Sequence, residues 1–538
     1  MRARFIAVLE ILAAFVGLIL LHLPLLRLPY FWDESGYYIP AALDFYRSGL
    51  LIPTSTEAIG HTPLVMIYLG LAWRLFGYSA WVTRTAMTLI AAGTVATLYA
   101  LGRRVASREI AAWSALLLAL SPLFFAQSTL ALVDLAAGLF TTLAVLFLLG
   151  DQLWLFALAA SLAFLSKETA VVLLPVVWLY AWRKGRGFAA GRPAALVPLG
   201  TWGPLVAPLV PLAAWVLYYH HATGYWTGSP GYLKYNLYST LSPARAFWSL
   251  LRRAYELFIG GFNWLLTACA LVGIWTQDTG HGTRESGFGN RDTILGTRDL
   301  GESQNSCPVS RVPRPVFESP LWRQFLFLAA GLTTVYMLLL SLVGGAVLPR
   351  YLLPVLPLFY VAAVGLTARL PRFPARLVLA AAAACFVWAW FINPPYPFPF
   401  EDNLAYADFV RLHEQAAHFL ETQPGQPRIL TAWPATDELT KPLLGYVGRP
   451  LAVVRARGFA PQEFADAPAD SFDLLYLYSR RWEPPGNWVV RFPLWLRLQG
   501  RHFDYHQQVA AEVLVARYRL RLLAEMKRRG QWVRIYSH

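Results

Sequence analysis

Long apolar segments separated by short polar ones dominate the first 390 residues of the chain. A membrane-spanning helix needs roughly 20 predominantly apolar residues. The segments that approach this length lie near residues 5–26, 79–101, 109–126, 129–149, 194–218, 256–276, 324–344, 350–368 and 374–392. The pattern therefore predicts a helical protein that crosses a membrane many times.

The segment between residues 149 and 194 allows two interpretations. Leu153–Leu165 and Thr169–Trp182 are each shorter than a full span, and a polar stretch separates them. One long helix would place the basic residues at 183–186 on the opposite side of the membrane from those at 103–108. Two short helices place both clusters in the cytoplasm, as the positive-inside rule prefers. We therefore predict about 11 transmembrane helices, with the N-terminus inside and the C-terminus outside.

This topology defines the loops of the membrane domain, residues 1–393. Residues 27–78 form a long outer loop, with a short helix at Ile39–Tyr46 and an interfacial apolar stretch at Pro63–Phe76. Residues 218–255 form a second outer loop, rich in Tyr and Trp. A third segment, about 277–322, is rich in Gly, Ser, Thr, Asp, Arg and Asn and has no apolar period, which predicts a mobile cytoplasmic loop.

The last part of the chain has the composition of a soluble protein. A proline-rich linker begins at residue 394, and about 140 residues follow. Helical patterns occupy 404–421 and 437–444, and strand-like patterns occupy 428–432, 451–454 and 474–478. Residues 394–538 are therefore predicted to form a small extracytoplasmic α/β domain.

Composition supports a membrane protein and argues against a nucleic-acid partner. Hydrophobic residues make up 57% of the chain and charged residues 14%. The formal net charge is +15, but many arginines lie in short loops between apolar segments, where they orient the chain in the bilayer. The three cysteines have the spacing of neither a disulfide framework nor a zinc site. No motif for nucleotide binding, zinc hydrolysis or serine hydrolysis is present.

Two acidic positions are candidates for catalysis. Asp33 and Glu34 follow the first span directly and are surrounded by aromatic residues, where an amphiphilic substrate could meet water. An exposed acidic pair is more often simply solvated, but general-base chemistry on an acceptor hydroxyl needs a carboxylate at such a place. Asp134 lies in the outer part of the fourth helix. Ionisable residues inside spans usually face a bundle interior or an aqueous cavity, which favours a functional role over a structural hydrogen bond.

Cations on the same side of the membrane suggest a site for an anionic lipid. Lys167 interrupts the two short helices, and Arg350 and Tyr351 open the tenth helix. Lys offers a phosphate a point charge and Arg a bidentate fork. Each of these residues could instead be an interfacial anchor. His61 in the first outer loop could contact a phosphate or a hydroxyl, although packing is the more common role for a lone histidine.

The order of these segments resembles the polytopic GT-C glycosyltransferases. The similar branch holds the protein O-mannosyltransferases and the lipid A aminoarabinose transferase. The match covers about the first 390 residues. The blocks that carry it are, in chain order, Asp33-Glu34 with Tyr37-Tyr38 and Gly49, His61-Thr62-Pro63-Leu64 with Phe76-Gly77 and Arg84, Ser121-Pro122, Asp134, Ser166-Lys167 and Arg350-Tyr351-Leu352-Leu353-Pro354.

The resemblance implies transfer of a sugar, with inversion, from a polyprenyl-phosphate donor to an acceptor outside the cytoplasm. The acceptor class, protein, lipid or polysaccharide, stays open. Asp33 would be the catalytic base and Asp134 a second acidic site residue. The substrate contacts would come from Glu34, His61, Lys167, Arg350 and Tyr351, with Lys167 and Arg350 near the lipid phosphate.

Two departures from the family pattern bear on the donor site. His61 stands where a lysine is usual, which weakens phosphate binding unless the imidazole is protonated, and Glu168 follows Lys167 where a small residue is common. Related enzymes differ over metal use. We therefore assign no cofactor, and a divalent metal ion held by the carboxylates stays open.

Two other classes of function remain in view. A transporter or flippase of an amphiphilic, lipid-linked substrate could use Asp134 and Glu10 as coupling groups, although the paired halves typical of transporters are not evident. A non-catalytic membrane scaffold would need none of the candidate residues. The prediction preferred here is a multi-pass glycosyltransferase of the cell inner (cytoplasmic) membrane.

Overall fold

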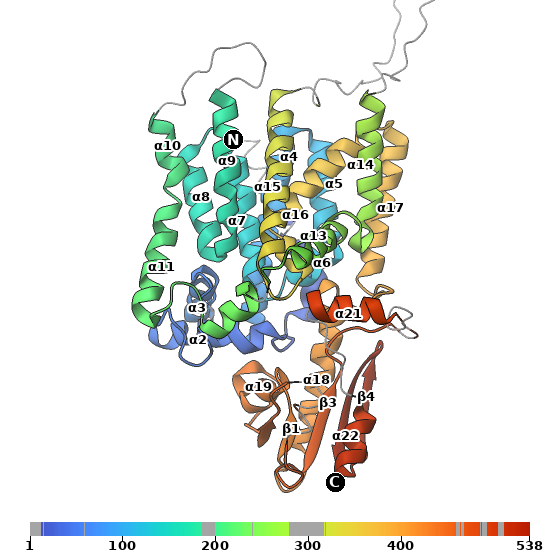
Figure 1. Ribbon diagram of the computed structural model, residues 1–538. Helices are drawn as coiled ribbons and strands as arrows, with labels where there is room; N and C mark the ends of the chain where they lie inside the picture. The colour runs from blue at the N-terminus through green and yellow to red at the C-terminus, as the bar shows by residue number, and fades with distance from the viewer. Residues whose placement is uncertain are drawn as a thin grey trace, which may run out of the picture.

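The protein is a bundle of helices with a sheet-containing domain at one end (Figure 1). The computed structural model describes residues 12–13, 15–58, 60–185, 199–238, 240–278, 317, 319–458, 463, 467–484, 486, 492–503 and 510–538. The first residues of the first predicted span, and most of the predicted loop 277–322, lie outside the described residues.

Apolar helices form the bundle. They are Phe15–Leu25, α4 (Ala80–Val105), α5 (Arg108–Leu120), α6 (Pro122–Gln127), α7 (Val133–Leu148), α8 (Leu153–Ser166), α9 (Leu173–Gly185), α10 (Leu199–Val206), α11 (Leu209–Thr223), α14 (Asn263–Asp278), α15 (Pro320–Leu342), α16 (Leu356–Thr367) and α17 (Arg372–Ala389). Within the described residues, four helices are long and apolar enough to cross a membrane, or five if one bent pair counts as a span. The predicted helical membrane fold is confirmed, and the count of 11 stays a prediction.

The interruption at Lys167 divides two short helices, as the sequence predicts. Helix α8 ends at Ser166, and Lys167 has an extended backbone, with φ −152° and ψ 125°. A short 3-10 turn, Glu168–Val172, then leads into α9. Because the break exposes backbone polar groups and a cation, it needs polar partners at this end of the bundle.

One sequence prediction about the bundle is wrong. The segment 109–126 is not one helix, because Ser121 has an extended backbone and Pro122 starts α6. In the predicted outer loop 218–255 the structure has helix α12 (Pro230–Leu233) and the start of α13 (Pro243–Phe258); its place outside the membrane stays a prediction. Helix α13 meets α14 at a bend of 42°. Its apolar residues recur every four positions, a helical period that the Tyr and Trp content of the segment conceals.

The first outer segment contains the two predicted short helices. They are α2 (Ile39–Ser48), which Gly49 ends with a left-handed backbone (φ 75°), and α3 (Leu64–Phe76). Immediately before α2, Glu34–Tyr38 forms a turn of π-helix. Such turns are frequent at functional sites because they change the direction of side chains within a helix. Here the turn follows Asp33.

The C-terminal domain contains one mixed sheet, with the strand order β2-β1-β3-β5-β4 in the described residues. The strands are β1 (Ile429–Thr431), β2 (Val453–Arg455), β3 (Leu474–Tyr478), β4 (Arg521–Arg528) and β5 (Gln531–Ser537). The first three are parallel and match the strand-like patterns of the sequence, while β4 and β5 form an antiparallel hairpin that was not predicted. Helices α18 (Ala405–Glu421) and α19 (Ala435–Thr440) also match their predicted segments.

The C-terminal domain rests on the segment that carries Asp33. The hydroxyl of Tyr446 donates to the carbonyl oxygen of Tyr30 over 2.9 Å. The indole of Trp433 lies over Gly36, where an added Cβ would be 2.7 Å from the ring atom Cζ2. Only a glycine allows this approach, so the packing of the two domains depends on the absence of a side chain at position 36.

We predict that Gly36→Ala destabilises the protein, because the methyl group would overlap the Trp433 ring. Overpacking of this kind costs about 1–3 kcal/mol. Thermal unfolding in detergent measures the effect as a lower midpoint temperature. The matched control is Gly203→Ala, where an added Cβ meets no atom within 4 Å. Equal midpoints for the two variants would contradict the prediction.

Candidate active site

Arg350 lies at the centre of a buried cluster of charged side chains. It belongs to the short 3-10 turn Pro349–Leu352, and 4% of it is exposed. Its Nη2 forms an ion pair with Asp33 and its Nη1 one with Glu401. Its Nε lies 3.6 Å from Asp134 Oδ2. One guanidinium therefore joins three carboxylates from widely separated parts of the chain.

Lys167 extends this cluster on the far side of Asp134. The Lys167 ammonium donates to Asp134 Oδ1 over 2.5 Å, and both side chains are almost fully buried. Asp134 lies in the first turn of α7 and Lys167 follows the last residue of α8. The structure thus brings together Asp33, Asp134, Lys167 and Arg350, which the sequence places as far as 317 residues apart.

Three cations surround the ring of Tyr351. The ring centroid lies 4.0 Å from Lys167 Nζ, 5.4 Å from Arg350 Cζ and 5.4 Å from Arg253 Cζ. An aromatic face stabilises a nearby cation, most strongly where water is excluded. The Tyr351 ring therefore adds to the carboxylates Asp134 and Glu256 in stabilising these three cations.

Arg253 is a site residue that sequence reasoning missed. It lies on α13 and is completely buried, yet its Nε and Nη2 have no hydrogen-bond partner among the described residues. Its Nη1 donates to the carbonyl oxygen of Leu348 over 2.5 Å and lies 3.4 Å from Glu256 Oε2 on the same helix. Unsatisfied buried donors on a cation are costly, so this geometry fits an anionic ligand. The sequence signal was the helical period of α13, which places Arg253 on the face opposite its exposed apolar residues.

Glu401 is the second residue that was missed, because it lies between the predicted proline-rich linker and the first predicted helix of the C-terminal domain. It follows the last helix of the bundle in a short turn, Phe400–Asp402. Burial raises the pKa of Glu401 to about 7. The nearby carboxylates of Asp33 and Asp134 also raise this pKa, and together these effects outweigh the Arg350 guanidinium, which lowers it. A carboxyl with such a pKa changes its charge near neutral pH.

Glu34 lies apart from this cluster. Its Oε1 accepts from Arg84 Nη1 over 2.6 Å and from the amide of Ala131, and its Oε2 accepts from the amide of Phe31 over 2.8 Å. Both members of the Glu34–Arg84 pair are fully buried. Since its oxygens are occupied by the fold, we infer that Glu34 holds the segment around Asp33 in place rather than contacting substrate.

His61 lies beside the cluster, at the edge of a separate pocket. Its Nδ1 is 3.2 Å from both carboxylate oxygens of Glu168, and its ring stacks on Tyr38 with centroids 5.9 Å apart. Thus the two departures from the expected pattern, His61 and Glu168, contact each other. The pair ties the outer segment to the break between α8 and α9.

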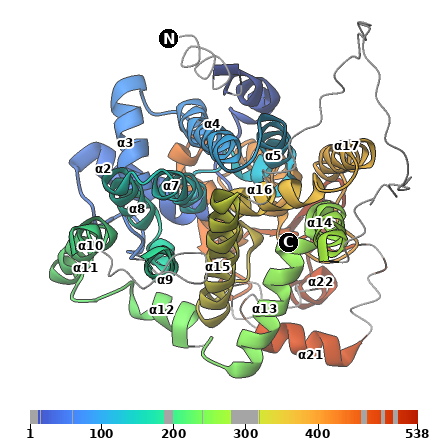
Figure 2. The same cartoon turned by 90° about the horizontal axis from the view of Figure 1, so that it is seen from above.

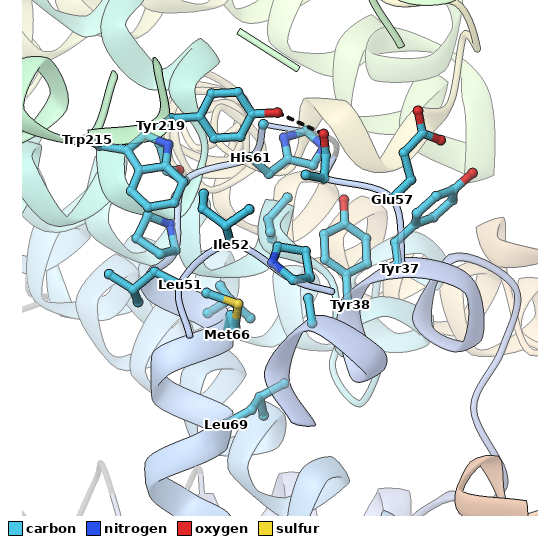
Figure 3. Close-up of a pocket in the computed structure, with 18 residues that line it drawn as sticks. Tyr37, Tyr38, Leu51, Ile52, Glu57, His61, Met66, Leu69, Trp215 and Tyr219 are labelled. Carbon is cyan, nitrogen blue, oxygen red and sulfur yellow. Dashed lines mark hydrogen bonds between the residues drawn. The ribbon is translucent and has the colours of Figure 1, made fainter. Parts of the chain in front are cut away.

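Figure 3 shows the pocket next to His61. It encloses about 560 Å³ of empty space, including its open mouth. Leu51, Ile52, Met66 and Leu69 from the outer segment and Trp215 from α11 form an apolar wall, while the hydroxyl of Tyr219 donates to the carbonyl oxygen of Ala58 over 2.8 Å. Tyr37, Tyr38, Glu57 and His61 also line the pocket (Figure 3), so it offers an apolar wall and a polar side.

The carboxylates of the cluster are arranged around a guanidinium. A divalent cation needs several oxygens directed at one open point. Asp33, Asp134 and Glu401 instead converge on the Arg350 guanidinium, and no group of three or more His, Cys, Asp or Glu is arranged to hold a metal within the part of the chain that the structure describes.

Comparison with known proteins agrees with this architecture. Residues 60–215 match the family model described as dolichyl-phosphate-mannose-protein mannosyltransferase. No curated protein sequence matches the chain significantly. The fold is similar to that of ArnT from Cupriavidus metallidurans bound to undecaprenyl phosphate, with a TM-score of 0.54, 13% identity and coverage of 98% of this chain and 97% of that one.

The apo state of the same ArnT gives a TM-score of 0.51 at 14% identity, with coverage of 99% of this chain and 98% of that one. A weaker similarity, with a TM-score of 0.44 and 11% identity, links the chain to the oligosaccharyltransferase AglB from Archaeoglobus fulgidus, over 87% of this chain and 69% of that one. The resemblance to GT-C enzymes that the sequence predicts is confirmed.

We predict that Glu34→Ala strongly destabilises the protein, because it leaves the Arg84 guanidinium buried without its carboxylate. Breaking a buried ion pair in this way costs about 3–5 kcal/mol. The loss appears as a lower unfolding midpoint in detergent. The control is Glu109→Ala, which removes an exposed partner of Arg376 and should change the midpoint little. A midpoint for Glu34→Ala equal to that of the control would show that the pair is not structural.

Proposed function

We propose that this chain is a glycosyltransferase with the GT-C fold, which moves a sugar from a polyprenyl-phosphate donor to an acceptor with Asp33 as general base. The observation that carries the proposal is the unequal exposure of the three carboxylates on Arg350. The side chain of Asp33 is 23% exposed, that of Asp134 1% and that of Glu401 3%. Asp33 is therefore the carboxylate that an acceptor hydroxyl can reach.

The cations on the other side of the cluster suit the leaving group. A donor of this kind loses its lipid phosphate as an anion, and positive groups fixed in a dry site stabilise the charge as it develops. Arg253 offers two donors without partners among the described residues. Lys167 and Arg350 flank the same Tyr351 ring. The phosphate would take the place next to these three cations.

The proposed reaction is a single displacement. Asp33 removes the proton from the acceptor hydroxyl, and the oxygen attacks the anomeric carbon of the sugar. The bond between that carbon and the phosphate oxygen breaks, and the phosphate keeps the electron pair. One displacement inverts the anomeric centre. Arg350 holds Asp33 Oδ2 and so orients the base, while Asp134 lies between Lys167 and Arg350 and contacts both.

The placement of the charges supports an extracytoplasmic site. Arg103 and Arg104 lie in the last turn of α4, and Arg183 and Lys184 in that of α9. Figure 1 shows these helix ends at the end of the bundle away from the C-terminal domain. By the positive-inside rule that end would face the cytoplasm. The site and the C-terminal domain would then lie outside the inner membrane, and the acceptor would be a protein, lipid or polysaccharide.

We predict that Asp33→Asn lowers transfer about 10²–10⁴-fold, because an amide cannot accept the acceptor proton. The assay follows labelled sugar from polyprenyl phosphate in proteoliposomes. Asp151→Asn is the matched control, since Asp151 is a 72% exposed carboxylate that pairs with Lys184. Transfer by Asp33→Asn at the rate of the control would refute the assignment of Asp33 as base.

We predict that the KM for the lipid donor rises as the pH rises through about 7. Below its pKa of about 7, Glu401 is neutral and competes weakly for Arg350; above it, the carboxylate holds the Nη1 edge of the guanidinium more strongly. Glu401→Gln should remove this dependence while transfer persists.

The control for this measurement is Glu483→Gln. The side chain of Glu483 is 45% exposed and pairs with Arg481, so this variant should keep the wild-type pH profile. A profile for Glu401→Gln that retains the change near pH 7 would assign the titration to another group.

A further inference from the structure

The C-terminal domain carries a short helix at the boundary between the domain and the bundle. This helix is α21 (Pro493–His502). Figure 1 shows it lying across the direction of the bundle helices, between them and the sheet. Seen along the bundle in Figure 2, α21 and α13 lie at the rim and extend past the ends of the spanning helices.

The exposed face of α21 combines apolar and cationic side chains. Leu494 is 67% exposed and Trp495 38% exposed. Arg497 and Arg501 are also exposed, at spacings of three and seven residues from Leu494, so the three share one face. The helix has no acidic residue. Aliphatic and Trp side chains next to arginines are typical of helices that lie at a membrane surface, where the guanidinium reaches the lipid phosphate.

Contact with α13 fixes the position of α21 relative to the bundle. The Arg252 guanidinium of α13 lies 5.3 Å from the centre of the Phe503 ring, at the end of α21. The adjoining His502 is buried. Helix α13 in turn bends into α14, so α21 is anchored to the end of an apolar bundle helix.

Helix α13 also has an exposed apolar face. Phe247, Leu251, Tyr255 and Ile259 repeat every four residues and are between 37% and 56% exposed. An apolar stripe of this length on an exposed face of a membrane protein points to lipid. The stripe and α21 belong to two helices that contact each other at the same end of the bundle.

We propose that α21 is a membrane-binding interfacial helix of the C-terminal domain, and that its partner is a bilayer surface with anionic phospholipid head groups. Leu494 and Trp495 enter the acyl boundary, and Arg497 and Arg501 contact the phosphates. The proposal does not rest on the transferase reaction, because it concerns the outside of the molecule. It means that the domain over the active site is held by the membrane as well as by the bundle.

A fluorescent probe at position 494 tests the contact. The three cysteines at 269, 307 and 385 are replaced by serine, Leu494→Cys is introduced and labelled with an environment-sensitive dye, and the full chain is placed in lipid nanodiscs. The emission should shift to the blue and should be quenched by phospholipids with brominated acyl chains. The matched control is Val513→Cys on α22 (Ala511–Tyr518), which is 56% exposed and should show neither effect.

The charge component is tested by Arg497→Glu combined with Arg501→Glu in the labelled Leu494→Cys background. Nanodiscs of phosphatidylcholine with and without phosphatidylglycerol are compared. With Arg497 and Arg501 intact, brominated lipids should quench the dye at position 494 more strongly when phosphatidylglycerol is present. The charge-reversed variant should lose this difference. Equal quenching in the two lipid compositions for the protein that keeps both arginines would overturn the preference for anionic lipid.

Two outcomes would overturn the proposal as a whole. One is a probe at 494 that responds to brominated lipids no more than the probe at 513. The other is a blue shift at 494 that occurs only in nanodiscs holding two copies of the chain, together with energy transfer between them, which would assign the face of α21 to a second copy. Sugar transfer is not part of either measurement, so failure here is distinct from failure of the proposed reaction.

Discussion

The site is organised by a single constraint: a buried guanidinium must be surrounded by negative charge. Arg350 meets this requirement with Asp33 from the outer segment, Asp134 from α7 and Glu401 from the segment leading to the C-terminal domain. Because removing a charge from water is costly, the three segments must come together for the guanidinium to be buried at all. Assembly of the site and closure of the two domains on each other are thus one folding event.

The sequence predicted those parts of the fold and site that have a local signal. The helix break at Lys167, the carboxylate at the start of α7 and three parallel strands follow from hydropathy, charge and spacing alone. Glu401 and Arg253 could not be found in this way. Glu401 follows a proline-rich linker and Arg253 lies in an aromatic segment, so neither interrupts an apolar run. Their roles come from tertiary contacts across the chain.

Neighbouring carboxylates can have different roles because their surroundings differ. Asp33 and Glu34 are adjacent in the sequence, yet Glu34 is fully enclosed by Arg84 and two backbone amides, whereas Asp33 keeps access to solvent. A turn of π-helix begins at Glu34, directly after Asp33. A buried structural ion pair next to an exposed group gives that group a rigid support, which a general base needs to keep its orientation.

The position of Glu401 also determines where the C-terminal domain can be separated from the bundle. By composition, the chain divides after residue 393, and an engineer would cut it there to exchange or remove the C-terminal domain. That cut would separate Glu401 from Arg350. A chimera that retains the charge balance of the site would have to keep the linker through Asn403 with the bundle, since Asn403 donates to the carbonyl oxygen of Ala389 at the end of α17. The exchangeable unit therefore begins near α18.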